Sequence, residues 1–177
     1  MATATGQSVI PADAPAWDAL FQAHSRALFR TACRITGSAA DAEDVLQTVF
    51  LRLLRGGARA AALEQPFAYL RRAAVNAALD VVRARGAGEW AECDDFAAPV
   101  PAAADPELRR ALRRALARLP PRSAEIFVLR HLEGIANRDI ARMLSLSAVH
   151  VAVVLHRARR QLQRELHAWN GAHHASR

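Results

Sequence analysis

The sequence predicts an all-α protein of two small helical domains joined by an acidic flexible linker, with a helix-turn-helix in the second domain. Three observations support this fold class. Apolar residues recur at spacings of three and four along most of the chain, as in amphipathic helices. The recurrence stops at 88–104, where glycine, proline and acidic residues are typical of a linker. No stretch of the sequence alternates as a strand would.

Five segments are expected along the chain. They are a disordered leader (1–15), a first helical domain (16–87), the linker (88–104), a second helical domain (105–168) and a tail (169–177). Charge is distributed unevenly among them. Residues 106–177 hold fourteen arginines against five acidic residues, whereas 88–105 hold five acidic residues and no arginine. A basic second domain is the electrostatic signature of a nucleic-acid-binding unit.

Three helices are expected in the first domain. The first helix runs from about Trp17 and ends at Gly37, and Ser38 can cap a second helix that reaches about Leu54. Pro66 opens the third helix, which is expected to reach Arg85. The expected inward positions are Leu20, Phe21, Ala27, Leu28, Ala32, Ile35, Val45, Val49, Phe50, Leu53, Leu54, Phe67, Leu70, Ala74, Ala77 and Val81.

The second domain is expected to open with two helices that prolines introduce. Pro106 begins one helix, with Asp105 as its N-cap, and Pro120-Pro121 begins the next. Proline suits these positions because its fixed φ matches a helix and its missing N–H is not needed there. The expected apolar faces comprise Leu108, Leu112, Leu116, Leu119, Ile126, Phe127, Leu129 and Leu132.

A helix-turn-helix is expected next. Leu144-Ser145-Leu146 forms its turn, and Ser147 can cap its second helix. The inner positions are Ile140, Ala141 and Leu144 in the first helix, and Val151, Leu155, Ala158 and Leu162 in the second. Arg157, Arg159, Arg160 and Arg164 lie around the second helix's C-terminal half. Such a helix suits the DNA major groove, and an ordinary helical hairpin with a solvated basic face is the alternative.

Acidic residues cluster at the start of the second expected helix. Asp41, Glu43 and Asp44 fall in its first turns, where negative charge is stabilised by the helix macrodipole. That electrostatic role alone would explain them. With Gln47, they could instead present a polar face to a partner protein.

A second polar cluster lies on the third expected helix. Asn76, Asp80 and Arg83 recur at spacings of four and three, so they share one side of the helix. Asp80 and Arg83 could form only a surface ion pair. Arg72, Arg83 and Arg85 could instead follow a DNA backbone, with the Tyr69 ring near an unstacked base.

No catalytic group, cofactor or metal site is predicted. Cys33 and Cys93 match no zinc or redox spacing, and no activated serine, cysteine or carboxylate pair points to an enzyme. The sequence also shows neither a signal peptide nor an apolar stretch of membrane-spanning length. We therefore expect a cytoplasmic protein that does not insert into a membrane.

Three motifs follow one another along the chain. They are DAEDVLQTVF at 41–50, AYLRRAAVNAALDVVR at 68–83, and LPPRSAEIFVLRHLEG at 119–134 with LHRAR at 155–159. With these motifs in this order and at these separations, roughly residues 20–166 resemble an extracytoplasmic-function (ECF) sigma factor. ECF sigma factors are compact promoter-specificity subunits of bacterial RNA polymerase.

The resemblance implies three sets of contacts. Core RNA polymerase would bind Asp41, Glu43, Asp44 and Gln47. The minus-ten promoter element would be recognised by Tyr69, Arg72, Asn76, Asp80, Arg83 and Arg85. The minus-thirty-five element would contact Arg122, Arg138, His150, Val153, Val154, Arg157, Arg159 and Arg160. The resemblance further implies a monomer when free, weak promoter binding without core polymerase, and a partner of the anti-sigma class as a separate chain.

The expected DNA-reading helix departs from the family pattern. Between Ala148 and Val154 only His150 is polar, so reading by apolar contact with thymine methyl groups is one interpretation. Two other functions are weighed against a sigma subunit. A stand-alone helix-turn-helix regulator would form a stable dimer on a palindrome. A sigma-derived protein-interaction module would bind DNA with little salt dependence.

Overall fold

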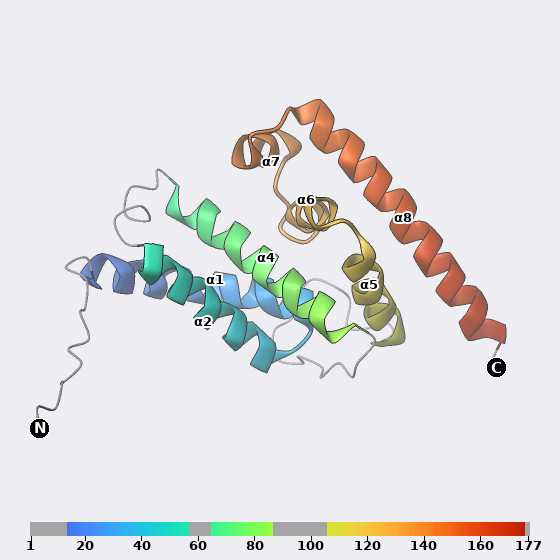
Figure 1. The fold of residues 1–177 in the computed structure, drawn as a ribbon, viewed down its shortest axis with the longest axis horizontal. Helices are drawn as coiled ribbons and strands as arrows, with labels where there is room; N and C mark the ends of the chain where they lie inside the picture. Colours follow the sequence, from blue (N-terminus) through green and yellow to red (C-terminus); the bar gives the residue numbers. More distant parts are fainter. Residues whose placement is uncertain (1–13, 57–64, 87–105, 176–177) are drawn as a thin grey trace, which may run out of the picture.

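The computed structural model describes residues 14–56, 65–86 and 106–175. Within these ranges the protein is helical and contains no strand, which confirms the all-α prediction (Figure 1). Its helices are α1 (Ala14–Thr36), α2 (Ala39–Gly56), α4 (Pro66–Arg85), α5 (Pro106–Arg118), α6 (Pro121–His131), α7 (Asn137–Leu144) and α8 (Ala148–Ala175).

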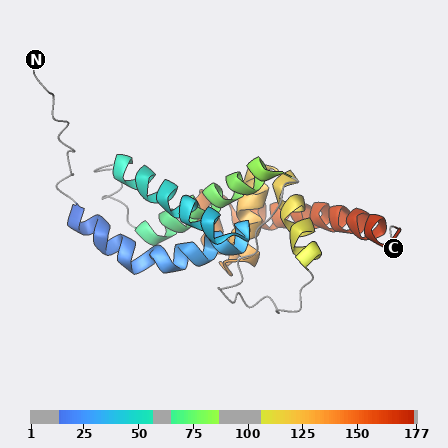
Figure 2. The ribbon, with the colours of Figure 1, turned by 90° about the horizontal axis from the view of Figure 1, so that it is seen from below.

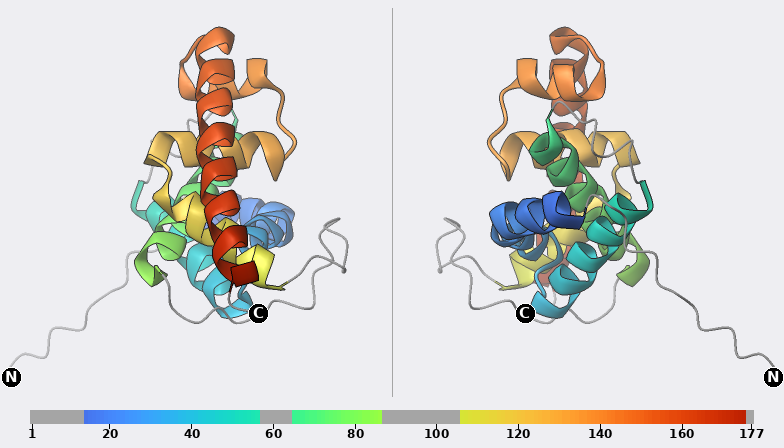
Figure 3. Two further views of the ribbon diagram at one scale, coloured as in Figure 1. Left: turned by 90° about the vertical axis from the view of Figure 1, so that its right-hand side faces the viewer. Right: turned by 90° about the vertical axis from the view of Figure 1, so that its left-hand side faces the viewer.

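The helices form two packed units. α1, α2 and α4 pack against one another, while α5, α6 and α7 each pack against the long helix α8. Seen from below, α1 and α2 lie on one side of the molecule and α8 on the other (Figure 2). In the left-hand view of Figure 3, α8 runs the full height of the second unit.

α4 joins the two units. Besides α1 and α2, it packs against α5 and α6, so the buried side chains of both units form one continuous core. Val75, Leu79 and Val82 are fully buried, although they lie off the expected stripe of α4. A helix covered on several sides must be apolar on several sides. α4 is therefore the central helix of the molecule.

The α1–α2 connection is a tight, hydrogen-bonded turn. Gly37 ends α1 with a φ of 71°, a left-handed conformation that glycine adopts without a Cβ clash. Ser38 Oγ accepts a hydrogen bond from the Asp41 backbone N–H at 3.3 Å, which confirms the expected cap of α2. Thr36 Oγ1 donates to Ala32 O at 2.9 Å within the same turn.

The helix-turn-helix is formed as expected. Ser145, with φ 53° and ψ 46°, ends α7 in the left-handed conformation, and the Leu146 N–H donates to Ala141 O at 2.8 Å. Ser147 Oγ then accepts from the His150 N–H at 3.1 Å and caps α8. The expected inner positions of both helices are all buried, which confirms Ile140, Ala141, Leu144, Val151, Leu155, Ala158 and Leu162.

Three expected inward positions in the remaining helices are wrong. Leu54 is 43% exposed, because it follows the buried Leu53 by one residue and so points about 100° away from it. Phe21 is 44% exposed, although its ring meets the Phe50 ring edge-on with centroids 4.5 Å apart. Leu108 is 42% exposed, because Ala111 and the residues after it form the buried face of α5.

The helices also extend beyond two expected boundaries. α1 begins at Ala14, so residues 14–15 are helical and do not belong to a disordered leader. α8 continues through 169–175, where a separate tail was expected. Trp169 and Glu165 of α8 line a shared hollow with Ala111 and Arg118 of α5, which supports this last part of α8. The rest of the leader, residues 57–64, the linker with Asp105, and residues 176–177 lie outside the described residues.

No single helix in the described ranges combines the length and hydropathy of a membrane span. α7 and α8 meet those two criteria only when they are taken together across their 107° bend.

Candidate nucleic-acid interface

One face of α2 is polar at its start and apolar at its end. Glu43, Asp44 and Gln47 are all exposed there. Leu51 and Leu54 follow at helical spacing and are 49% and 43% exposed. The opposite face of α2 is buried against α1 and α4. We call these five residues the α2 face; its mixed polar and apolar character is typical of a protein-docking surface.

Asp41 does not belong to the α2 face. Its side chain is largely buried, and Asp41 Oδ1 accepts a hydrogen bond from Arg85 Nη2 of α4 at 2.5 Å. Because the Asp41 backbone is also held by the Ser38 cap, the backbone and the side chain of this residue both stabilise the first unit. Sequence reasoning placed Asp41 and Arg85 in two different contact sets, and the structure pairs them with each other.

The other five residues predicted for the minus-ten element share one face of α4. Tyr69, Arg72, Asn76, Asp80 and Arg83 follow at spacings of three and four, which aligns them along the helix. Tyr69 is 44% exposed and lines a groove of about 470 Å³ with Arg72 and with Arg142 and Met143 of α7. Arg83 donates to Asp80 Oδ1 at 3.1 Å, so the surface ion pair exists.

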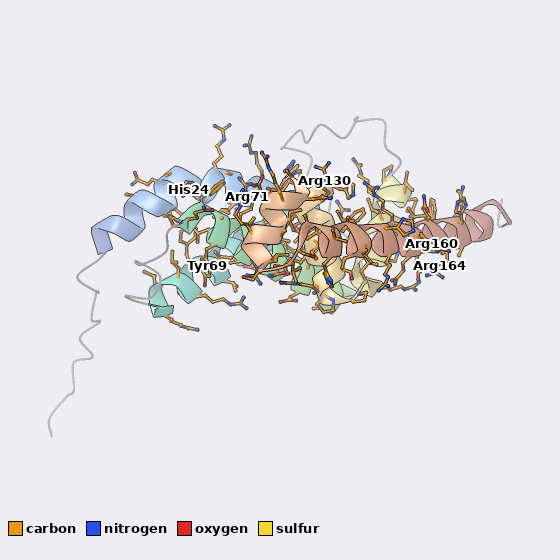
Figure 4. The ribbon with its side chains drawn as sticks, turned by 90° about the horizontal axis from the view of Figure 1, so that it is seen from above. His24, Tyr69, Arg71, Arg130, Arg160 and Arg164 are labelled. Carbon is orange, nitrogen blue, oxygen red and sulfur yellow. The ribbon has the colours of Figure 1, made fainter. Side chains whose placement is uncertain are left out.

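The outer face of α8 carries most of the residues predicted for the minus-thirty-five element. His150, Val153, Arg157 and Arg160 lie away from the buried stripe of the same helix and are exposed, whereas Val154 lies beside the stripe and packs partly against the core. Two residues outside the predicted set, Val149 and Arg164, share this face, and Val149 is 74% exposed. Figure 4 shows Arg160 and Arg164 along α8, far from Tyr69. A basic helix-turn-helix with an exposed outer face is typical of DNA-binding proteins.

Arg159 points elsewhere. Its Nε donates to His131 Nε2 of α6 at 3.3 Å. Partial burial, with the nearby Arg159 and Arg130 guanidinium groups, lowers the pKa of His131. His131 is therefore a neutral acceptor for Arg159 near neutral pH. Arg159 links α8 to α6 and lies off the outer face.

The two remaining arginines predicted for the minus-thirty-five element differ in their surroundings. The Arg138 side chain is 83% exposed at the start of α7, with Asp139 Oδ1 3.9 Å away. Arg122 is held in place: it donates to Leu144 O at 2.9 Å, at the first residue of the turn, and to Glu125 Oε2 at 2.9 Å. Arg122 thereby ties α6 to the helix-turn-helix.

Glu125 is a buried carboxylate shared by both units. The residue is 3% exposed. Its Oε1 accepts from Arg72 Nε at 2.6 Å and from Asn76 Nδ2 at 3.1 Å, both on α4, while its Oε2 accepts from Arg122. Sequence reasoning did not single out Glu125, because an acid within an apolar helix gives no sign of distant partners. All three of its donors are predicted DNA contacts.

Glu133, just after α6, is the second acidic link. Its side chain is 7% exposed; Oε1 accepts from Arg34 Nη2 of α1 at 2.7 Å, and Arg71 Nε of α4 lies 3.7 Å from Oε2. The Arg71 guanidinium also lies over the Phe67 ring, 4.3 Å from its centroid, and His24 stacks on the same ring. The described residues contain no cluster of three metal-binding side chains.

The comparisons with known proteins agree with these two units. Residues 20–88 match the family Sigma-70 region 2, and residues 109–162 match Sigma-70, region 4. The chain is 33% identical over 157 residues to the ECF RNA polymerase sigma factor SigM of Mycobacterium tuberculosis, which covers 89% of this chain and 80% of SigM.

Two further relatives extend the comparison. ECF RNA polymerase sigma factor SigE of Mycolicibacterium smegmatis is 32% identical over 160 residues; the alignment covers 84% of this chain but only 61% of SigE. The structure of CnrH in complex with the cytosolic domain of CnrY has a similar fold, with a TM-score of 0.53 and 24% identity across 87% of this chain and 89% of CnrH. The chain therefore belongs to the ECF sigma factors, the promoter-specificity subunits of bacterial RNA polymerase.

Proposed function

We propose that the protein docks on core RNA polymerase through the α2 face and presents α4 and α8 to the minus-ten and minus-thirty-five promoter elements. The observation that supports this division of labour most strongly is the separation of three faces on three helices, of which those of α2 and α8 are exposed and that of α4 is partly exposed. Each face carries residues that the sequence resemblance had assigned to one partner. Neither the stand-alone regulator nor the interaction module accounts for all three faces.

Docking on polymerase is assigned to Glu43, Asp44 and Gln47, with Leu51 and Leu54 added from the structure. Exposed leucines beside acidic groups suit an interface whose centre is apolar and whose rim is charged. Asp41 remains in the predicted set, but its burial and its Arg85 partner support a structural role. The bounds of the two helical domains, 16–87 and 105–168, are likewise proposed.

Minus-ten recognition is assigned to the face of α4 that runs from Tyr69 to Arg83. An exposed ring at the groove edge can stack on an unpaired base, which contributes about 1–3 kcal/mol. Arg72, Asn76 and Arg83 provide donors for phosphates and base edges. Arg85 contributes indirectly, by holding Asp41 and thus the position of α2 against α4.

Minus-thirty-five binding is assigned to the outer face of α8 and to the two arginines that flank the helix-turn-helix. Arg157, Arg160 and Arg138 are exposed and supply phosphate contacts, whereas His150 and Val153 reach base edges. Val154 remains in the predicted set, but its packing against the core supports a structural role. Arg159 supports α8 through His131. A protein of the anti-sigma class is a further proposed partner; the proposal is supported by CnrH, a protein of similar fold that is solved in complex with the cytosolic domain of another protein, CnrY.

The minus-ten assignment is tested by promoter opening. Holoenzyme would be assembled from core polymerase and the unsubstituted protein, the Tyr69→Ala variant or the Tyr69→Trp variant, and opening would be followed by the fluorescence of 2-aminopurine in the minus-ten element. The loss of stacking in Tyr69→Ala should reduce opening, while Tyr69→Trp keeps a ring and should retain it. Equal opening by all three proteins would refute a stacking role for Tyr69.

A further inference from the structure

We propose that Val149 and Val153, at the start of α8, form a methyl-reading surface that recognises the C5-methyl group of a pyrimidine in the minus-thirty-five element. This inference rests on the proposed function of α8 and adds to it the chemistry by which bases are distinguished. Two pyrimidines carry such a group in the major groove: thymine, and cytosine that has been methylated at C5. We therefore expect promoter choice to respond to cytosine methylation as well as to sequence.

The two valines contribute little to the folded helix. Val149 is 74% exposed and Val153 is 42% exposed, whereas Val151 is fully buried and Val154 packs partly against the core. β-Branched residues lose side-chain freedom in a helix, so an exposed valine is less favourable there than alanine. Neither burial nor helix propensity accounts for Val149 and Val153, which points to contact with a partner.

The charge on the same face of α8 indicates that this partner is DNA. Val149 and Val153 are four residues apart, so they are neighbours on one side of the helix. Arg157, Arg160 and Arg164 continue that side toward the C-terminus and are exposed. Three guanidinium groups next to an apolar patch suit a polyanion whose phosphates flank the contacted bases.

The chemistry of the helix start limits what it can read. In a helix-turn-helix, the first residues of the second helix contact base edges in the major groove. Between Ala148 and Leu155 only His150 has a polar side chain, so most of this segment can form no hydrogen bond with a base. The apolar group that a base pair presents in the major groove is the pyrimidine C5-methyl. Ala148 and Ala152 are exposed too, and their small side chains let the helix approach the bases closely.

The spacing of the two valines sets the spacing of the methyl groups that they can contact. Four residues of α-helix rise by about 6 Å, and successive bases of one strand are about 3.4 Å apart. The contacted methyl groups should therefore lie about two base-pair steps apart. Each contact removes roughly one methyl group from water, which corresponds to about a fourfold change in affinity.

The proposal is tested by removing single methyl groups from the DNA. Holoenzyme would be titrated, by fluorescence anisotropy, with a promoter duplex in which each thymine of the minus-thirty-five element is replaced in turn by deoxyuridine. Uracil keeps every hydrogen-bonding group of thymine and lacks only the C5-methyl group. Affinity should fall about fourfold at the contacted positions, which should lie about two steps apart.

A second series of duplexes tests the other source of the methyl group. A cytosine–guanine pair would be placed at each position in turn, with and without methylation of cytosine C5. At the positions that respond to uracil, methylation should raise the affinity by a similar factor, because the methyl group is the same.

Protein variants assign each methyl group to a valine. Val149→Ala should bind thymine and uracil equally at one position, and Val153→Ala should do so at the other. Alanine favours a helix more than valine does, so neither variant should lower the melting temperature. Arg157→Ala is the matched control. Arg157 lies on the same face but is assigned to phosphate, so its loss should weaken binding to thymine and uracil duplexes by the same factor.

Uracil effects that disappear position by position in the two valine variants, with 5-methylcytosine acting like thymine, would establish the methyl-reading surface. Effects of uracil that persist in both variants would overturn it, because the methyl group would then act through the shape of the DNA. A response to uracil without one to 5-methylcytosine would limit the surface to thymine and overturn the expected response to methylation.

Failure of this inference is distinguishable from failure of the proposed function. If no position responds to either modified base while Arg157→Ala still weakens binding, the methyl-reading surface is overturned and the proposed function of α8 stands. The valines would then be left to contact a protein. If neither Arg157→Ala nor replacement of the whole minus-thirty-five element alters binding, the proposed function of α8 fails, and the inference fails with it.

Discussion

The outer face of α8 allows a quantitative prediction about salt dependence. Arg157, Arg160 and Arg164 are exposed on this face and form no salt bridge within the described residues. If each contacts one phosphate, each releases about 0.9 counterions when the protein binds duplex DNA. Replacing all three by alanine should therefore lower the slope of log affinity against log salt by about 2.7.

This difference is large enough to measure. Between about 50 and 200 mM salt, a slope difference of about 2.7 means that the affinity of the unsubstituted protein falls by a factor roughly 40 times larger than that of the variant. The assay is filter binding or fluorescence anisotropy of holoenzyme on a promoter duplex across that salt range. Replacement of Arg26 and Arg30, which are exposed on α1, is the control and should leave the slope unchanged. An unchanged slope in the α8 variant would refute phosphate contact by this face.

Three further predictions concern one or two positions each. Ser145→Gly should stabilise the protein by about 0.5 kcal/mol in thermal unfolding, because relief of the left-handed serine outweighs the added backbone entropy of glycine. By NMR titration the pKa of His131 should lie below the ordinary value of about 6.5, and Arg159→Ala should raise it. The stability from neutral His131 is thus present above about pH 6.5 and is lost as pH falls through its lowered pKa. Replacing Asp44 and Gln47 by alanine should weaken binding to core polymerase without changing the melting temperature, since both side chains are exposed; a matching fall in melting temperature would indicate misfolding instead.

Local sequence patterns were sufficient for the helices and their caps. Gly37, Ser38 and Ser147 each act within a few residues, and the structure confirms the role that local chemistry gave them. The stripe of α8 was also predictable, because one side of that helix packs on its own unit and the other meets solvent.

Local sequence patterns did not predict the burial of residues that are covered by distant segments of the chain. The apolar residues of α4 occur on several sides, and only the packing of α5 and α6 against it explains Val75 and Leu79. Asp41 carries the signature of an exposed helix start, but Arg85 of another helix buries it. Glu125 shows the limit most clearly, since two of its partners precede it by 53 and 49 residues.

The central claim is that this protein directs core polymerase to promoters. The most direct test is run-off transcription by purified core bacterial RNA polymerase from DNA upstream of the protein's own gene, with and without the protein. The account predicts a transcript of defined start that appears only when the protein is present. Failure to yield any protein-dependent transcript, together with failure to bind core polymerase in a pull-down, would contradict it.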